Sequence, residues 1–410
     1  MKITSSLLAA DRDFRIGRCE FELGDYALAL ERFEGLGPDN KEAAGCAEKC
    51  RAQLGAAAPA KAIKPFTFSA TEVSWKTKNI PLPRAGINDM KLDGTSVWLG
   101  LGPSRWDEQS RELANNDPAA GSAMAGGLVR FDSATGDTTT FPVGTSISYS
   151  WVTSLAIANG RVWVGTYGKG IDVFNKATGE WSNFNETNGL PMNYVQCLDA
   201  DEDSLWVGAS HNRQGAVARY LFKTGQWQTF LPTDYPARSG PPANRIFSVK
   251  SVAGNVWFLT DKESIGRVPV FRYEIKANQW MCYYTTNFTA SLGVAADRVW
   301  FGPAARGAGR VGYEESLVSC KPDGTDWQTI RKQDGLPAFP VYSILESHNK
   351  VLLGGGDGTV MVFDPIQKHF EIFQLPVKSW GFVNALLNIG DEIWMGRSWP
   401  QGQLQALTPP

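Results

Sequence analysis

The stretch RVWVGTYGKGIDVFNKATGEWSNF, residues 161–184, decides the fold of this 410-residue chain. It consists of an apolar run that ends in Gly-Thr, a second apolar run, a Thr-Gly turn and an aromatic segment. Short apolar runs bounded by glycine-containing turns are typical of β-strands. The stretch therefore predicts three consecutive strands, with Trp163 in the first and Trp181 in the third.

The first of these runs recurs along the chain in seven copies. The copies are VWLG (97–100), VWVG (162–165), LWVG (205–208), VWFL (256–259), VWFG (299–302), VLLG (351–354) and IWMG (393–396). Most neighbouring copies lie roughly 40 to 50 residues apart, and self-similarity at this period indicates the blades of a β-propeller.

Each copy lies between further strand-like segments. About ten residues before it lies an alternating segment, such as VTSLAIA (152–158), which predicts the inner strand of a blade. A third strand and, after a tight turn, an outer strand follow the copy, and the outer strand carries an aromatic residue near its start. These residues are Trp181, Trp227, Trp280, Trp327 and Phe370. The pattern predicts four strands in each blade.

The two ends of the repeat region complement each other. The seventh copy is followed only by GQLQALTPP, so this blade lacks an outer strand, whereas TEVSWKTKNIPLP (71–83) is an outer strand without a blade. In that segment Trp75 takes the place of Trp181. We expect the N-terminal strand to complete the last blade, which removes the open edge of the ring. The sequence thus predicts an all-β, seven-bladed propeller over residues 66–410, with six or eight blades as the alternatives.

Residues 1–54 have a different pattern, with apolar residues at helical intervals. They resemble a tetratricopeptide repeat at Gly17, Gly24, Tyr26, Ala29 and Phe33. Since a helical solenoid needs about three repeats to bury its own core, this segment is expected to cap the main domain or to contact a partner. Residues 55–65, GAAAPAKAIKP, are predicted to be an Ala/Pro linker.

The stretch SWVTSLAIANGRVWVGTYGKGIDVFNKATGEWSNFNETNGLPMNYV, together with a second GLP at 335–337, resembles the two-component regulator propeller repeat. The resemblance implies a propeller that senses a ligand, and it implies no catalytic residues. A weaker similarity, through the Trp couplet and the Thr-Gly turn, is to the streptogramin lyases. Those enzymes depend on a His and a divalent cation near the central channel, so this second resemblance would imply an enzyme.

The charge, the cysteines and the apolar runs of the sequence argue against several classes of function. The formal net charge of −2 argues against a nucleic-acid partner, because nucleic-acid binders usually have a basic excess. The six cysteines form no CxxC pair and are expected to be free thiols, and no metal site or cofactor fingerprint is found. No apolar run of about 18 residues is present, so no membrane span is expected. The predicted location is cytoplasmic if the chain is complete, and periplasmic or extracellular if an upstream export segment is missing.

The loops between second and third strands are long, whereas the turns at the opposite ends of the strands are short. Because long loops on a rigid framework carry function, the long loops mark the expected functional face. The candidate binding residues there are Arg105, Trp106, Trp151, His211, Arg213, Arg238, Arg267, Arg306, Arg310, Trp380, Arg397 and Trp399. Arg binds carboxylates and Trp offers stacking area, but acidic residues in the same loops are equally consistent with an ordinary solvated surface.

The sequence leaves two functions open. The first is a non-enzymatic binding or scaffold protein that uses the propeller loop face and the helical N-terminus, and whose partner is another protein, or an anionic or carbohydrate ligand. The second is a lyase-like enzyme or a receptor for a small ligand or carbohydrate that uses the mouth of the channel, with His211 as its candidate His. The recurring tryptophans are assigned to neither, because a residue repeated in nearly every blade is expected to fill the same gap between sheets.

Overall fold

The computed structural model describes residues 30, 33–36, 40–56, 69–80, 85–104, 110, 112–113, 125–211, 214–235, 240–261, 268–285, 289–303, 316–337, 340–374, 381–398 and 403–408. The chain divides into two compact units, Met1–Thr67 and Phe68–Pro410. None of the described helices combines the length and the apolar character needed to cross a bilayer.

In the first unit the structure describes helix α3 (Lys41–Ala56) and a helical stretch before it. Asn40 caps α3, since its side-chain oxygen accepts a hydrogen bond from the N–H of Ala43 at 3.0 Å. Phe33 is buried against Ala47 and Cys50 of the helix. The other four residues of the tetratricopeptide resemblance, Gly17, Gly24, Tyr26 and Ala29, lie outside the described residues.

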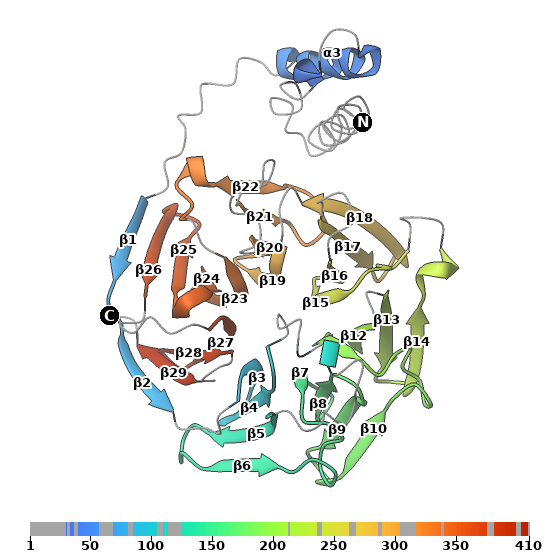
Figure 1. Ribbon diagram of the computed structural model, residues 1–410, viewed down its shortest axis with the longest axis vertical. Coiled ribbons are helices and arrows are strands. Elements are labelled where there is room, and N and C mark those ends of the chain that lie inside the picture. Colours follow the sequence, from blue (N-terminus) through green and yellow to red (C-terminus); the bar gives the residue numbers. More distant parts are fainter. Residues whose placement is uncertain are drawn as a thin grey trace. The chain divides into compact units, whose positions relative to one another are not determined.

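The second unit is a ring of seven β-sheets, as predicted (Figure 1). The inner strands are β3 (Ile87–Asp93), β7 (Val152–Ala158), β11 (Val195–Ala200), β15 (Ile246–Val252), β19 (Thr289–Ala295), β23 (Val341–Ser347) and β27 (Val383–Ile389). The second strands are β4 (Ser96–Leu101), β8 (Arg161–Thr166), β12 (Ser204–His211), β16 (Asn255–Thr260), β20 (Arg298–Pro303), β24 (Lys350–Gly355) and β28 (Glu392–Arg397). Blades one to seven are numbered by these strands in chain order.

The third strands are β5 (Gly127–Asp132), β9 (Gly170–Asn175), β13 (Gln214–Leu221), β17 (Val268–Glu274), β21 (Ser316–Cys320), β25 (Val360–Asp364) and β29 (Leu404–Thr408). The outer strands are β6 (Thr138–Phe141), β10 (Trp181–Phe184), β14 (Gln226–Phe230), β18 (Gln279–Thr285), β22 (Gln328–Arg331), β26 (His369–Phe373) and β2 (Lys76–Ile80). Short 3-10 turns occur at η1 (Pro232–Asp234), η2 (Lys332–Asp334) and η3 (Gly356–Gly358).

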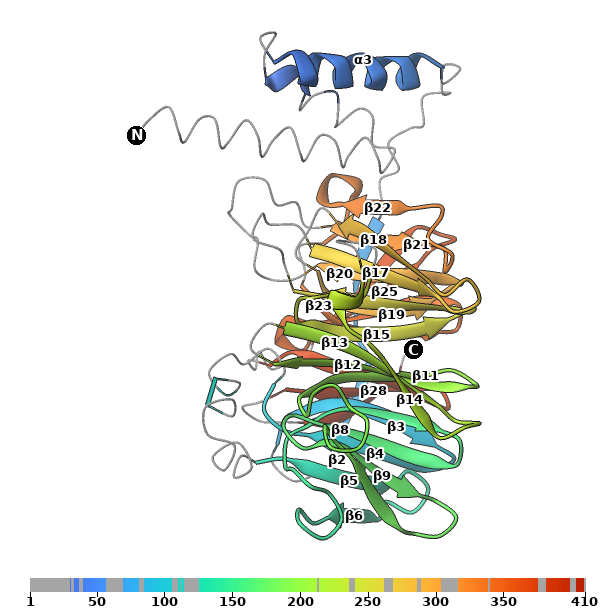
Figure 2. The ribbon, with the colours of Figure 1, turned by 90° about the vertical axis from the view of Figure 1, so that its right-hand side faces the viewer.

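Antiparallel pairing within each blade gives the ring two different faces (Figure 2). On the hairpin face, tight turns join the first strand to the second and the third to the outer one. Asn159 and Gly160, between β7 and β8, have φ angles of 49° and 68°, as a two-residue type I′ turn requires. On the opposite face, here called the loop face, the second strands end and the chain passes from each blade to the next.

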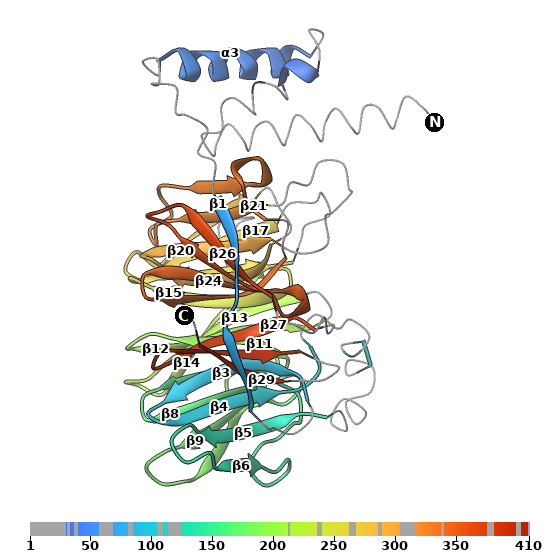
Figure 3. The same cartoon turned by 90° about the vertical axis from the view of Figure 1, so that its left-hand side faces the viewer.

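The ring closes through the N-terminal segment, as predicted, but with one strand more than expected. β2 pairs antiparallel with β29 and so becomes the outer strand of blade seven. The residues before it form β1 (Ser69–Val73), which pairs in parallel with β26 of blade six. Figure 3 shows β1 and β2 following one another along the outside of the ring. The segment read as one strand therefore spans two blades, and it breaks at Ser74 and Trp75.

The recurring tryptophans fill the gaps between blades. Trp163 of blade two is fully buried, and its ring centroid lies 5.2 Å from that of Tyr220 in blade three. Trp206 of blade three is buried in the same way, 5.4 Å from Tyr273 in blade four. Packing of one large side chain at each junction is the framework role expected from the repeat.

The glycine of the couplet makes room for the next blade. In six blades a Cβ atom on this glycine would lie 2.6–2.8 Å from the side chain that begins the next inner strand, closer than real contacts allow. The pairs are Gly100–Val152, Gly165–Val195, Gly208–Ile246, Gly302–Val341, Gly354–Val383 and Gly396–Ile87. Blade four has Leu259 at the glycine position, and blade five begins with Thr289 instead of Val or Ile. Both departures from the pattern occur at the same junction, between blades four and five.

Candidate functional site

Three of the twelve candidate binding residues lie in the described part of the chain: Trp151, His211 and Arg397. The other nine lie outside it and stay predictions. They are Arg105, Trp106, Arg213, Arg238, Arg267, Arg306, Arg310, Trp380 and Trp399.

Trp151 lies at the root of the long loop of blade one. Its side chain is 0% exposed, so it is not an exposed stacking surface. A Cβ on Gly102 would lie 2.6 Å from Cδ1 of Trp151, and a Cβ on Gly126 would lie 2.3 Å from the carbonyl oxygen of Ser150. Only glycine permits such close approach at both ends of the loop. Trp151 and its neighbour Ser150 therefore pack closely against Gly102 at the end of β4 and Gly126 at the start of β5.

Trp151 and His211 are the two ends of a row of aromatic side chains, here called the aromatic ladder (Trp151, Tyr167, Tyr194 and His211). The ring centroids of Trp151 and Tyr167 are 4.4 Å apart. Tyr167 meets Tyr194 edge to face at 5.3 Å, and Tyr194 stacks on His211 at 4.1 Å with the planes inclined by 7°. Both geometries are favourable arrangements for aromatic pairs.

Backbone hydrogen bonds hold the ladder in place. The N–H of Tyr167 donates to the carbonyl of Trp151 at 3.0 Å, and the N–H of Ser210 donates to the carbonyl of Tyr194 at 2.9 Å. Tyr167 and Tyr194 also form an isolated antiparallel bridge. The ladder thus joins the loop-face ends of blades two and three.

The outer end of the ladder is the accessible one. Tyr194 and His211 are partly exposed, whereas Tyr167 is buried. Burial raises the pKa of the Tyr194 hydroxyl, and the nearby Glu186 carboxylate raises this pKa further. Nε2 of His211 is buried and has no hydrogen-bond partner among the described residues. The partial exposure of His211 therefore comes from atoms other than Nε2.

Arg397 is a buried residue rather than a surface cation. It ends β28 on the loop face and is 4% exposed. Its Nη1 donates to the side-chain oxygen of Gln403 at 3.4 Å, which ties β28 to the start of β29. In the described geometry, Arg397 therefore links two strands at the loop-face end of blade seven.

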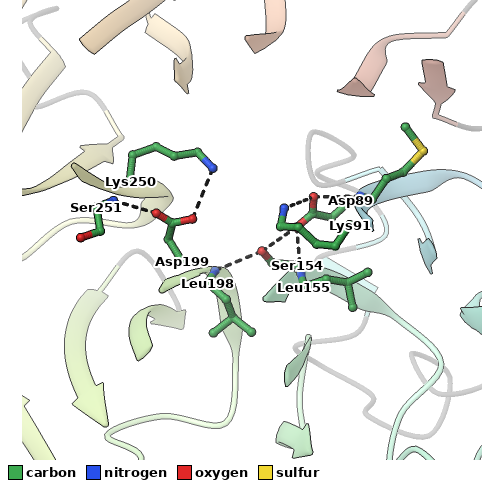
Figure 4. Close-up of polar contacts among 9 residues, drawn as sticks. Asp89, Lys91, Ser154, Leu155, Leu198, Asp199, Lys250 and Ser251 are labelled. Atoms are coloured by element: carbon green, nitrogen blue, oxygen red, sulfur yellow. Dashed lines mark hydrogen bonds and ion pairs between the residues drawn. The ribbon is translucent and has the colours of Figure 1, made fainter. Parts of the chain in front are cut away.

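A polar network on the inner strands spans blades one to four (Figure 4). Oδ2 of Asp89 accepts hydrogen bonds from the hydroxyl of Ser154 at 3.0 Å and from the N–H of Leu155 at 2.8 Å. The Ser154 hydroxyl in turn accepts the N–H of Leu198 at 3.1 Å. Side chains of one inner strand thus satisfy backbone donors of the next.

Both lysines of this network are paired with carboxylates. Lys91 contacts Asp89 at 2.9 Å, and Lys250 contacts Asp199 at 3.5 Å. Asp199 raises the pKa of the Lys250 ammonium, burial opposes that rise, and Asp89 adds to it. Since each charge has an opposite partner, the network holds neighbouring blades together and does not present a free charge to a ligand.

The described residues give little support to acid–base or metal chemistry at this face. Within the described ranges, no three His, Cys, Asp or Glu side chains gather in a way that could hold a metal ion. Along the ladder the ring neighbours are aromatic, and stacking is the chemistry that such groups offer. The ladder can support loops and contact a planar or apolar group.

Sequence reasoning missed Tyr149, Tyr167 and Tyr194, which belong to the same cluster as Trp151. Each lies just outside a predicted strand, in SYSW (148–151), GTYG (165–168) and MNYV (192–195). The propeller topology brings these three strand ends to one face. The aromatic residues there were therefore a signal that could have indicated the cluster. Their mutual stacking was not visible, because residues 167 and 194 belong to different blades.

No family model and no curated protein matches this chain. Several solved propeller structures are similar to it. U3-55K is 12% identical, with a TM-score of 0.57 over 81% of this chain and 98% of its own. The extracellular domain of the putative hybrid two component system BT4673 from B. thetaiotaomicron is 15% identical, with a TM-score of 0.55 over 82% of this chain and 40% of its own. YCF48 bound to D1 peptide is 15% identical, with a TM-score of 0.55 over 84% of this chain and all of its own. At these identities the likeness concerns the fold.

Proposed function

We propose that this chain is a non-enzymatic binding or scaffold protein whose propeller binds a partner protein at its loop face. The observation that carries the proposal is the aromatic ladder, which links the loop-face ends of blades two and three and leaves Tyr194 and His211 partly exposed. Rigid aromatic side chains at a surface are typical anchors of protein interfaces.

The comparisons are consistent with this proposal. Similar propellers include a WD40 repeat structure, RRP9, and a structure of YCF48 with a bound peptide. The two-component repeat family implies a ligand-sensing role. In that form of the proposal, the loop face binds a small molecule in place of a protein. The similar fold of the BT4673 extracellular domain supports it to the extent that fold alone can.

A pull-down from an extract of the source cells tests the proposal. The full chain serves as bait, beside a Tyr194→Ala/His211→Ala double variant and Ile366→Ser as the control. Ile366 is 85% exposed and lies in the turn between β25 and β26, on the hairpin face. We expect a partner that the wild type and the control capture and that the double variant loses. A strictly monomeric chain in native mass spectrometry, with no captured partner, would contradict the proposal.

A further inference from the structure

Arg245 is a cation without an acidic partner beside the aromatic ladder. It directly precedes β15 on the loop face and is partly exposed. Its guanidinium carbon lies 5.8 Å from the centroid of the Phe247 ring. In the part of the chain that the structure describes, its side chain makes no ion pair or hydrogen bond. An arginine held on an aromatic ring keeps its planar set of donors available.

Backbone pairing places Arg245 next to the exposed end of the ladder. The N–H of Ile246 donates to the hydroxyl of Ser210 at 2.8 Å. On the other side of Arg245, Asn244 bridges to Gln214, which is the cross-strand partner of His211. His211, which follows Ser210, and Arg245, which precedes Ile246, are therefore neighbours along the backbones of adjoining blades.

Among the described residues, neither Glu186 nor Asp261 forms an ion pair with Arg245. The carboxylate of Glu186 accepts a hydrogen bond from the N–H of Asn193 at 2.8 Å. Asp261 donates its backbone N–H to the carbonyl of Arg245 at 2.8 Å, but no ion pair joins the two side chains. Arg245 thus differs from Lys91 and Lys250, which each have a carboxylate at hand.

We propose that Tyr194, His211, Arg245 and Phe247 form a recognition site for an acidic segment of a partner protein. The Arg245 guanidinium pairs with a carboxylate of that segment, and an adjoining apolar or aromatic side chain stacks on the Tyr194–His211 pair. Charge-assisted bonds from Arg are strong, and the ring beneath the guanidinium limits its hydration. The inference rests on the proposed function, because it names the chemistry of the same partner.

The test uses the purified full chain and a display library of random short peptides. The strongest binders are labelled with fluorescein and measured by fluorescence anisotropy against the wild type, Arg245→Gln and Arg161→Gln. Arg161 is a matched control, since its guanidinium carbon lies 6.0 Å from the ring centroid of Trp163 at the start of β8, on the hairpin face. Thermal melting checks that each variant is folded.

We expect selected peptides to contain Asp or Glu and Arg245→Gln to weaken them about tenfold or more, the usual effect of losing a charged hydrogen bond. Arg161→Gln should bind like the wild type. Replacing the acidic residue of the peptide by its amide should weaken binding as much as Arg245→Gln does. The two changes together should weaken binding little more than either change alone. Higher salt should weaken the wild-type complex.

Other outcomes separate the two proposals. Peptides without acidic residues that lose affinity with the Tyr194→Ala/His211→Ala variant would overturn this inference and leave the proposed function standing. Wild-type affinity of Arg245→Gln for an acidic peptide would also overturn the inference. If neither a peptide nor a cellular protein binds, both proposals fail.

Discussion

Trp75 and Phe373 stack face to face, with ring centroids 5.1 Å apart and planes inclined by 8°. Trp75 lies between β1 and β2, and Phe373 ends the outer strand of blade six. Trp181 meets Phe141 of the preceding blade at the corresponding positions, but edge to face, with the centroids 5.5 Å apart and the planes inclined by 65°. The stack therefore joins the N-terminal segment to blade six at the point where the segment passes to blade seven.

Removing this stack should loosen the closure of the ring. Trp75→Ala is expected to lower the free energy of unfolding by about 3–5 kcal/mol, as for other buried aromatic residues cut to Ala. Trp163→Ala, at a junction inside the ring, is expected to cost about as much. Trp75→Phe keeps a stacking ring and should cost much less. Urea unfolding measures all three, and a Trp75→Ala variant as stable as the wild type would show that the stack contributes nothing to closure.

Replacing Gly165 by Ala should destabilise the fold unless the side chains of the next blade can move. A Cβ there would lie 2.8 Å from Cγ1 of Val195, so Gly165→Ala is expected to cost about 1–3 kcal/mol by overpacking. Combined with Val195→Ala it should cost less than the sum of the two single changes, because Val195→Ala removes the Cγ1 atom that the added methyl group would meet. Gly356→Ala is the control, since its Cβ would lie 3.5 Å from Pro340, an ordinary contact. Additive costs in denaturant unfolding would contradict the prediction.

Asp199 should stabilise the fold at neutral pH and lose this effect in the alkaline range. It raises the pKa of Lys250 above the ordinary value of 10.5, so the folded state holds this proton more tightly than the unfolded state does. The resulting stability is full below pH 10.5 and is lost as the pH rises through the folded pKa. We expect Asp199→Asn to reduce stability at neutral pH and to weaken its alkaline decline. The urea midpoint of both proteins across the alkaline range measures this, and parallel curves would be the contrary result.

His211 should be replaceable by another ring. His211→Phe keeps the stack on Tyr194 and removes a buried nitrogen that has no hydrogen-bond partner. The melting temperature is expected to stay the same or to rise, and the affinity for an acidic peptide should be retained. A lower melting temperature would show that Nε2 makes a contact that stabilises the fold. Loss of a measurable activity in this variant would favour the lyase-like alternative.

Much of the architecture could be predicted because the blades repeat. Seven copies of one couplet predicted seven second strands, and the alternating segments before them predicted the inner strands. The outer strand needed for closure was visible because the last blade lacked one. The site was less predictable, since Trp151 and His211 were named without the two tyrosines that connect them.

The sequence by itself determined the number of blades, the closure of the ring and the framework role of the tryptophans, because these depend on local patterns that recur. Only the tertiary structure decided that β1 adds to blade six and that Trp151 and His211 belong to one ladder. It also placed Arg245 beside His211. The physical reason is that these contacts join residues of different blades at single positions. Their partners are chosen by the closure of the whole ring, and a pattern that repeats along the chain carries no information about a contact that occurs once.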